Sequence, residues 1–177
     1  MGVRRVTTGH GAGGRSVFDS DVDVDETTLE MMPGIVFRHL WASQATPAVP
    51  VDSPADLGGP YFPSPGGVRV VQVVFPPQEQ GGGVPPADLE AATAEVEEKL
   101  PGLISYMELD EPGMHTTDTV DIGVVVEGEV YLELDEGAEK HLAAGEVVVQ
   151  NGTRHRWHNR SERPCVMTFV LVGATRR

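Results

Sequence analysis

Hydrophobic and polar residues alternate along most of the second half of the chain. Residues 129–134 show this most clearly, with Val130, Leu132 and Leu134 on one side of an extended strand. Alternation with a period of two is typical of a β-strand that buries one face. Further short segments follow, separated by turn sequences such as Asn151-Gly152. We therefore expect strands over 122–126, 129–134, 139–142, 146–150, 154–159 and 165–172.

The first half of the chain is less regular. Residues 68–75 form a continuous apolar, β-branched run between Gly-Gly and Pro-Pro, which predicts a strand. Residues 3–8, 16–18 and 35–41 fit shorter strands. Residues 45–65 contain many Pro, Gly and Asp and are typical of a long loop. A loop of this length is uncommon in a compact domain unless it covers or binds something.

One segment has the pattern of a helix. Residues 87–100 are rich in Ala, Glu and Leu, and Leu89, Ala92, Val96 and Leu100 recur at helical spacing. Asp88 lies near the start, where a negative charge complements the helix dipole, and Pro101-Gly102 ends the helix. A Gly-rich linker over 78–86 precedes it. We expect the four apolar side chains to pack on the β-structure.

Short, regularly spaced strands with frequent turn residues indicate a β-barrel or sandwich. The composition agrees, because 21 Gly and 14 Pro favour turns, and an apolar fraction of 40% suits a globular core. The expected fold class is all-β with minor α. An antiparallel β-barrel would occupy 105–177, and an N-terminal extension over 1–104 would pack on it in one compact domain.

The charge limits the classes of partner. A formal net charge of −14 would repel phosphate backbones and anionic membrane surfaces, so we expect neither nucleic-acid nor membrane binding. The acidic residues are explained by a solvated surface or, alternatively, by attraction of a metal or cationic ligand. The N-terminus lacks a secretory apolar region, and Cys165 is a core residue in an apolar run. We expect a soluble, cytoplasmic protein.

Three residues stand out as candidate chemistry. His115 follows the turn sequence Glu111-Pro112-Gly113 and opens a β-segment. In a strand, Thr117, Thr119 and Asp121 share a face with His115, so His115 and Asp121 can both point inward. His155 comes from a different strand. Two or three such ligands on neighbouring strands are what a catalytic metal site needs, since it keeps positions open for water or substrate.

The same stretch resembles the paired motifs of the cupin superfamily. In the first motif, Gly113, His115 and Gly128 match, whereas Thr117 stands where a second His is usual and Asp121 where Glu is usual. In the second motif, Gly145 matches, Asn151-Gly152 provides the turn, and His155-x-x-x-Asn159 matches in full. The resemblance covers about residues 105–173 and extends to small bacterial single-cupin proteins. It implies a double-stranded β-helix, or jelly roll, and by family habit a homodimer.

The resemblance also implies a site. His115, Asp121 and His155 would be the catalytic residues and the ligands of a divalent metal, Fe(II), Mn(II), Zn(II) or Ni(II), in a two-His, one-carboxylate set. Tyr106, Met114, Thr117 and Trp157 would line the substrate pocket. Alternatively, Asp121 bonds backbone amides at a strand end and the two histidines are satisfied pocket residues. His158 would face away from the pocket unless a bulge turns it inward.

Three functions are compatible with this site. The first is a small metal-dependent enzyme acting on a small organic metabolite by dioxygenase, lyase, isomerase or dehydratase chemistry. The second is a metal-free enzyme with a histidine as general acid or base in a dehydration or cyclisation. The third is a non-catalytic cupin that binds a small ligand.

Overall fold

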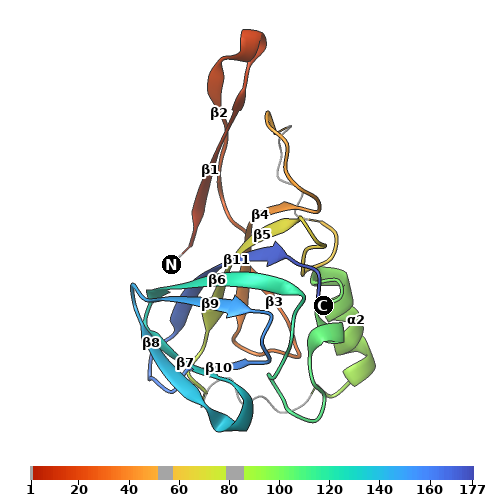
Figure 1. Ribbon diagram of the computed structural model, residues 1–177, viewed down its shortest axis with the longest axis vertical. Helices are drawn as coiled ribbons and strands as arrows, with labels where there is room; N and C mark the ends of the chain where they lie inside the picture. The colour runs from red at the N-terminus through yellow and green to blue at the C-terminus, as the bar shows by residue number, and fades with distance from the viewer. Residues whose placement is uncertain (1, 52–57, 79–85) are drawn as a thin grey trace.

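Two antiparallel sheets form the body of the protein (Figure 1). The computed structural model describes residues 2–51, 58–78 and 86–177. Within them, six strands form one sheet in the order β3-β4-β5-β11-β6-β9, and three form another in the order β10-β7-β8. Isolated bridges pair His115 with Met107 and with His155. The two sheets are separately hydrogen-bonded and do not close into a single barrel.

Most predicted strands are confirmed, with changes at their ends. The strand predicted at 68–75 is found with the same bounds, whereas the one predicted at 154–159 is reduced to three residues because His155 pairs only with His115. The strands of the two sheets are β3 (Thr27–Thr28), β4 (Val36–Ser43), β5 (Val68–Phe75), β6 (Thr119–Glu127), β7 (Glu129–Glu133), β8 (Glu139–Ala143), β9 (Val147–Asn151), β10 (Arg156–His158) and β11 (Cys165–Gly173).

The N-terminal extension contributes to the main sheet. β4 pairs with β5, and β5 pairs with β11, so strands from both parts of the chain share one hydrogen-bonded sheet. The sheets enclose a core that includes Val71, Val73, Met167 and Phe169. Their alternation along β5 and β11 follows from the inward-facing positions of each strand.

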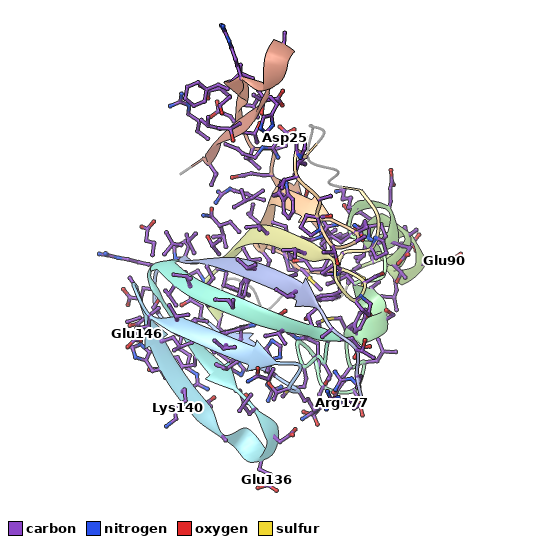
Figure 2. The ribbon with its side chains drawn as sticks, turned by 45° about the horizontal axis from the view of Figure 1, so that its top comes forward. Asp25, Glu90, Glu136, Lys140, Glu146 and Arg177 are labelled. Atoms are coloured by element: carbon purple, nitrogen blue, oxygen red, sulfur yellow. The ribbon has the colours of Figure 1, made fainter. Side chains whose placement is uncertain are left out.

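The two strands predicted at 3–8 and 16–18 belong to one hairpin. β1 (Arg4–His10) pairs antiparallel with β2 (Ser16–Asp23) around a short 3-10 turn, Ala12–Gly14. The turn requires glycine at Gly13 and Gly14, which both have positive φ. Figure 1 shows the hairpin extending away from the sheets, and Asp25 lies at its base in Figure 2.

The predicted helix is α2 (Leu89–Lys99), which the Asp88 side chain caps by accepting a hydrogen bond from the backbone of Ala91. Within the helix, the side chains of Ala92 and Val96 are buried, and so is that of Leu100 directly after it. The expectation that Leu89 packs on the β-structure is wrong, because Leu89 is 61% exposed. The helix is bonded to the body through its later turns, where Lys99 donates to the carbonyl of Thr28, so its first residue projects into solvent.

Part of the long loop predicted at 45–65 lies outside the described residues, as does most of the linker predicted at 78–86. The described part includes Tyr61 and Phe62, which are buried against the core. The backbone N–H of Tyr61 donates to the carbonyl of Pro101, which ties the loop to the end of the helix. No helix among the described residues is long and apolar enough to cross a membrane.

Candidate functional site

Two imidazoles face each other across an isolated pair of backbone hydrogen bonds. The N–H of His115 donates to the carbonyl of His155 at 3.0 Å, and the N–H of His155 donates to the carbonyl of His115 at 2.9 Å. The ring centroids are 4.1 Å apart. The fold therefore brings together two histidines that are distant in sequence, as the pairing of their segments requires.

Both imidazoles have one nitrogen bonded to the backbone. His115 Nδ1 lies 3.0 Å from the carbonyl oxygen of Gly113, and His155 Nδ1 lies 2.9 Å from that of Thr153. Because a carbonyl only accepts, each Nδ1 carries the proton and donates. In the neutral ring, Nε2 is then left with its lone pair. This is the tautomer that binds a metal ion or accepts a proton through Nε2.

Burial keeps this pair neutral. Desolvation and, to a smaller extent, the neighbouring His115 lower the pKa of His155 to about 4, against an opposing effect of its bond to the Thr153 carbonyl. Desolvation also lowers the pKa of His115, although its bond to the Gly113 carbonyl acts in the opposite direction. At neutral pH both rings are uncharged, which is the state a metal ligand needs.

Asp121 supplies a carboxylate on the inner face of β6. It lies between Leu171 on β11 and Gln150 on β9, and it is 6% exposed. Its Oδ1 is buried and has no hydrogen-bond partner among the described residues. Desolvation raises the pKa of Asp121 to about 6, against a smaller opposing effect of a hydrogen bond from Thr119. The alternative in which backbone amides satisfy this carboxylate is therefore not supported at Oδ1.

The three residues line one pocket with a mainly apolar wall. Its volume is about 110 Å³, less than the ~150 Å³ of a cavity that holds benzene. None of the described residues that line it is a lysine or an arginine. The lining residues are Met32, Phe37, Tyr61, Phe62, Val71, Val73, Leu103, Met107, His115, Asp121, His155, Trp157, Phe169 and Leu171.

Of the four predicted pocket residues, the structure places one in the pocket wall. Trp157 lines the pocket with its ring edge-on to His155, at a centroid distance of 5.7 Å. Tyr106, Met114 and Thr117 are not among the lining residues. Tyr106 makes an edge-on ring contact with Phe62, Met114 is buried at 1% exposure, and the Thr117 hydroxyl accepts a hydrogen bond from Thr119.

A buried arginine holds the wall formed by the long loop. Arg69 on β5 is 2% exposed and donates to the carbonyls of Gly58 and Pro60, each at 3.1 Å. Its Nη1 also donates to Nδ1 of His39 at 3.1 Å. The carbonyls immediately precede Tyr61, so Arg69 fixes the segment that places Tyr61 and Phe62 over the pocket.

The comparisons with known proteins agree with this architecture. A family model described as "Cupin domain" matches residues 104–171. A phomopsin biosynthesis cluster protein C' from Diaporthe leptostromiformis is 30% identical over 96% of this chain and 78% of its own length. The chain belongs to the cupin family.

Other cupin relatives carry an activity in their names. A cupin-domain-containing oxidoreductase of Neurospora crassa is 32% identical over 60% of this chain and 58% of its own length. Among solved structures, a putative ethanolamine utilization protein from Salmonella typhimurium aligns over 99% of both chains with a TM-score of 0.45 and 14% identity. The expectation of a bacterial protein is not confirmed, since these sequence relatives are fungal.

Asn159, the last residue of the second cupin motif, has a structural role. Its amide donates to the carbonyls of Phe75 and Arg163 at 2.9 and 2.7 Å, and its Oδ1 accepts from the backbone and hydroxyl of Ser161. It joins the turn after β10 to the end of β5.

A second group of possible metal ligands lies outside the pocket. The ligand atoms of Glu133, Glu139 and His158 all lie within 4.8 Å of one another, a criterion that His115, Asp121 and His155 do not meet together. Arg156 makes a bidentate pair with Glu133, and Arg160 pairs with Glu139, so both carboxylates are already neutralised. We interpret this group as a network of ion pairs.

The sequence pattern did not reveal most of the pocket wall. Phe37, Phe169 and Leu171 occupy inward positions that strand alternation could have indicated. Tyr61 and Phe62 come from a loop without periodicity, and only the unusual length of that loop pointed to a covering role.

Proposed function

We propose that this cupin is an enzyme that acts on a small, largely apolar organic molecule with a divalent metal ion held by His115, Asp121 and His155. The observation that carries the proposal is the common tautomer of the two histidines. Each Nδ1 is tied to a backbone carbonyl, so each Nε2 keeps its lone pair, and both histidines line the pocket. A carbonyl that fixes the tautomer of a histidine in this way is the usual outer-shell arrangement of histidine metal ligands.

The donor set fits a divalent transition metal in its chemistry. Two neutral imidazoles and one carboxylate suit Fe(II) and related ions, and Asp121 offers a buried oxygen that has no partner among the described residues. The three side chains are more widely spaced than in a closed metal site, because their ligand atoms do not all lie within 4.8 Å of one another. Binding an ion would therefore require these side chains to close on it.

The residues that line the pocket restrict the charge and polarity of the substrate. Its lining offers aromatic and aliphatic surface and, among the described residues, no cationic side chain to hold an anionic group. The small cavity would take the reacting end of an uncharged molecule, while Trp157 and Phe62 exclude water around it. The bound metal would supply a Lewis acid or a centre for oxidation. The names of the Neurospora crassa oxidoreductase and other relatives support the oxidative reaction.

Metal content tests this proposal. The protein, purified without a histidine tag and reconstituted with Fe(II), Mn(II), Zn(II) or Ni(II) separately, should hold about one equivalent of at least one of them by elemental analysis. His155→Ala should lose most of that metal. His141→Ala removes a half-exposed histidine on β8 and is the matched control. Less than about a tenth of an equivalent in the wild type after every reconstitution would contradict the proposal.

A second candidate function is metal-free acid–base catalysis. It is favoured by the spacing of the three groups, which is wider than a metal site needs, and by the neutral imidazoles beside a carboxyl group whose pKa is raised to about 6. Asp121 could hold a proton while His155 Nε2 accepts one. Turnover that persists in strong chelators but is lost in His155→Ala would favour this mechanism over the metal-dependent one.

A further inference from the structure

The segment that carries His115 is joined to the rest of the site by few backbone bonds. Residues 107–115, which we call the His115 loop, begin at Met107, a residue of the pocket lining, and end at His115 itself. His115 pairs with Met107 and with His155 only through isolated bridges, which belong to no strand of the two sheets. The spacing of the two histidines therefore depends on more than a regular strand ladder.

One arginine binds this loop at two points. Nε and Nη2 of Arg154 donate to the two carboxylate oxygens of Glu108, each at 2.7 Å. Nη2 also lies 3.0 Å from a carboxylate oxygen of Glu111. The remaining nitrogen, Nη1, donates at 2.9 Å to Asp135, in the turn between β7 and β8. Arg154 thus links the His115 loop to that turn and to the segment of His155, its neighbour in the chain.

This cluster is better suited to fix a geometry than an isolated surface ion pair. Single exposed pairs contribute little, whereas a bidentate arginine–carboxylate pair within a network of charges can hold its partners in a defined position. The side chain of Arg154 is 26% exposed and that of Glu108 is 32% exposed, so water screens the pair only in part. The guanidinium also holds the pKa of Glu108 below its usual range, which keeps the pair charged at neutral pH.

The loop contains the carbonyl that fixes the tautomer of His115. Gly113 has a positive φ of 84°, which turns the chain just before the histidine. Its carbonyl oxygen lies 3.0 Å from His115 Nδ1, so the position of this oxygen depends on the shape of the loop. The carbonyl that serves His155 in the same way belongs to Thr153, which precedes Arg154 in the chain. That second carbonyl does not depend on the ion pairs.

We propose that Arg154 is a positioning residue of the metal site, which acts by holding the His115 loop against the segment of His155. Its ion pairs with the loop fix the Gly113 carbonyl, and this carbonyl keeps the lone pair of His115 on Nε2. The inference rests on the proposed function, because the role that it assigns is toward the metal ion of that proposal.

The tautomer of His115 in the metal-free protein is the first test. Long-range nitrogen–proton correlation spectra of isotope-labelled protein at neutral pH distinguish the two nitrogens of each ring, with signals assigned from His115→Gln and His155→Gln. The wild type should show a proton on Nδ1 of both histidines. Arg154→Gln should add the Nε2–H form at His115 and leave His155 unchanged. A general loss of structure would alter both rings, so this difference separates positioning from stability.

Metal affinity is the second test. The ion is whichever of Fe(II), Mn(II), Zn(II) and Ni(II) the wild type retains, and competition with a chromogenic chelator measures its dissociation constant. Arg154→Gln should raise this constant by about 10- to 100-fold, as expected for the loss of an outer-shell partner. Arg154→Lys keeps the charge but not the planar fork and should have an intermediate effect.

Glu108 provides a check on how Arg154 acts. Glu108→Gln removes the bidentate pair from the side of the loop and should weaken metal binding in the same direction. The double variant Arg154→Gln, Glu108→Gln should lose no more affinity than Arg154→Gln alone, because the two residues act as one unit. Should Arg154→Gln fail to fold, Arg154→Lys and Glu108→Gln provide both measurements.

Arg160→Gln is the matched control. Arg160 makes a two-bond pair with Glu139, as Arg154 does with Glu108, but its partner lies on β8 and not in the His115 loop. It should leave the tautomer and the dissociation constant unchanged.

Two results for Arg154→Gln would overturn the proposal: an unchanged tautomer of His115, or an unchanged dissociation constant for an ion that the wild type binds. A wild type that binds none of the four ions would contradict the proposed function instead. The tautomer comparison in the metal-free protein would then still decide whether Arg154 positions His115.

Discussion

At the scale of single residues, Asn159 uses its full side-chain hydrogen-bonding capacity inside the protein. Its two amide hydrogens go to the carbonyls of Phe75 and Arg163, and its oxygen accepts twice from Ser161. The residue is 4% exposed, so water cannot replace these bonds. The family motif pointed to Asn159, but only the structure shows that its role is to join two segments.

Asn159→Ala should therefore lower the free energy of unfolding by about 3 kcal/mol, because it leaves buried carbonyls without donors. Urea denaturation followed by circular dichroism measures this. Asn151→Ala, at an exposed position of β9, should cost less than about 0.5 kcal/mol. A similar loss in both variants would contradict the structural role assigned to Asn159.

His39 is a second residue whose role depends on its surroundings. The sequence alone indicated no role for His39. In the structure, burial and the Arg69 guanidinium lower the pKa of His39 from 6.5 to about 4. Its Nδ1 accepts a hydrogen bond from Arg69, an arrangement that protonation would break.

This shift predicts a pH dependence. Between pH 6.5 and 4 the unfolded chain binds a proton at His39 that the folded protein does not, so stability falls as the pH falls through that window. From about pH 7.5 to about pH 4.5, the wild type should lose about 2 kcal/mol more than His39→Gln. Urea unfolding at each pH provides the comparison, with His10→Gln on the hairpin as a control. Equal losses in wild type and His39→Gln would show that this histidine does not contribute.

At the scale of elements, local signals located the strands and the helix, but their ends depended on tertiary contacts. β5 was predicted with its observed bounds, since glycine and proline pairs enclose it. β10 is shorter than predicted because its first residues leave the sheet to pair with the segment around His115. The two N-terminal strands were predicted, but their pairing in a projecting hairpin was not.

The cap of α2 gives a test at this scale. The Asp88 carboxylate accepts from the backbone of Ala91 at 3.0 Å, so Asp88→Ala should destabilise the protein by about 1 kcal/mol. Glu90→Ala is the control. Glu90 is also acidic and lies in the first turn, at the outer edge of the molecule in Figure 2, but the capping residue is Asp88. Thermal unfolding of the three proteins compares them, and an equal effect of both substitutions would assign the loss to charge alone.

At the scale of the whole molecule, the two faces of the large sheet differ in how far they are covered. The inner face lines the pocket through Val71, Phe169 and Asp121, while the outer face has apolar residues that nothing in the described chain covers fully.

The homodimer that the cupin resemblance implies would have a thermodynamic consequence. If folding is coupled to association, the melting temperature should rise by several degrees between ~2 µM and ~200 µM protein. Calorimetry at a series of concentrations measures this, and a melting temperature that stays constant would contradict the coupling.

The sequence by itself determined the strands, the helix, the inward positions of His115 and Asp121, and the resemblance that paired His115 with His155. These features depend on short-range periodicity, turn residues and motif spacing, which are properties of the local chain. Only the tertiary structure decided the tautomer of each histidine, the unpaired oxygen of Asp121 and the wall formed by Tyr61 and Phe62. Each of these depends on contacts between segments far apart in the chain, and local pattern does not specify which segments meet.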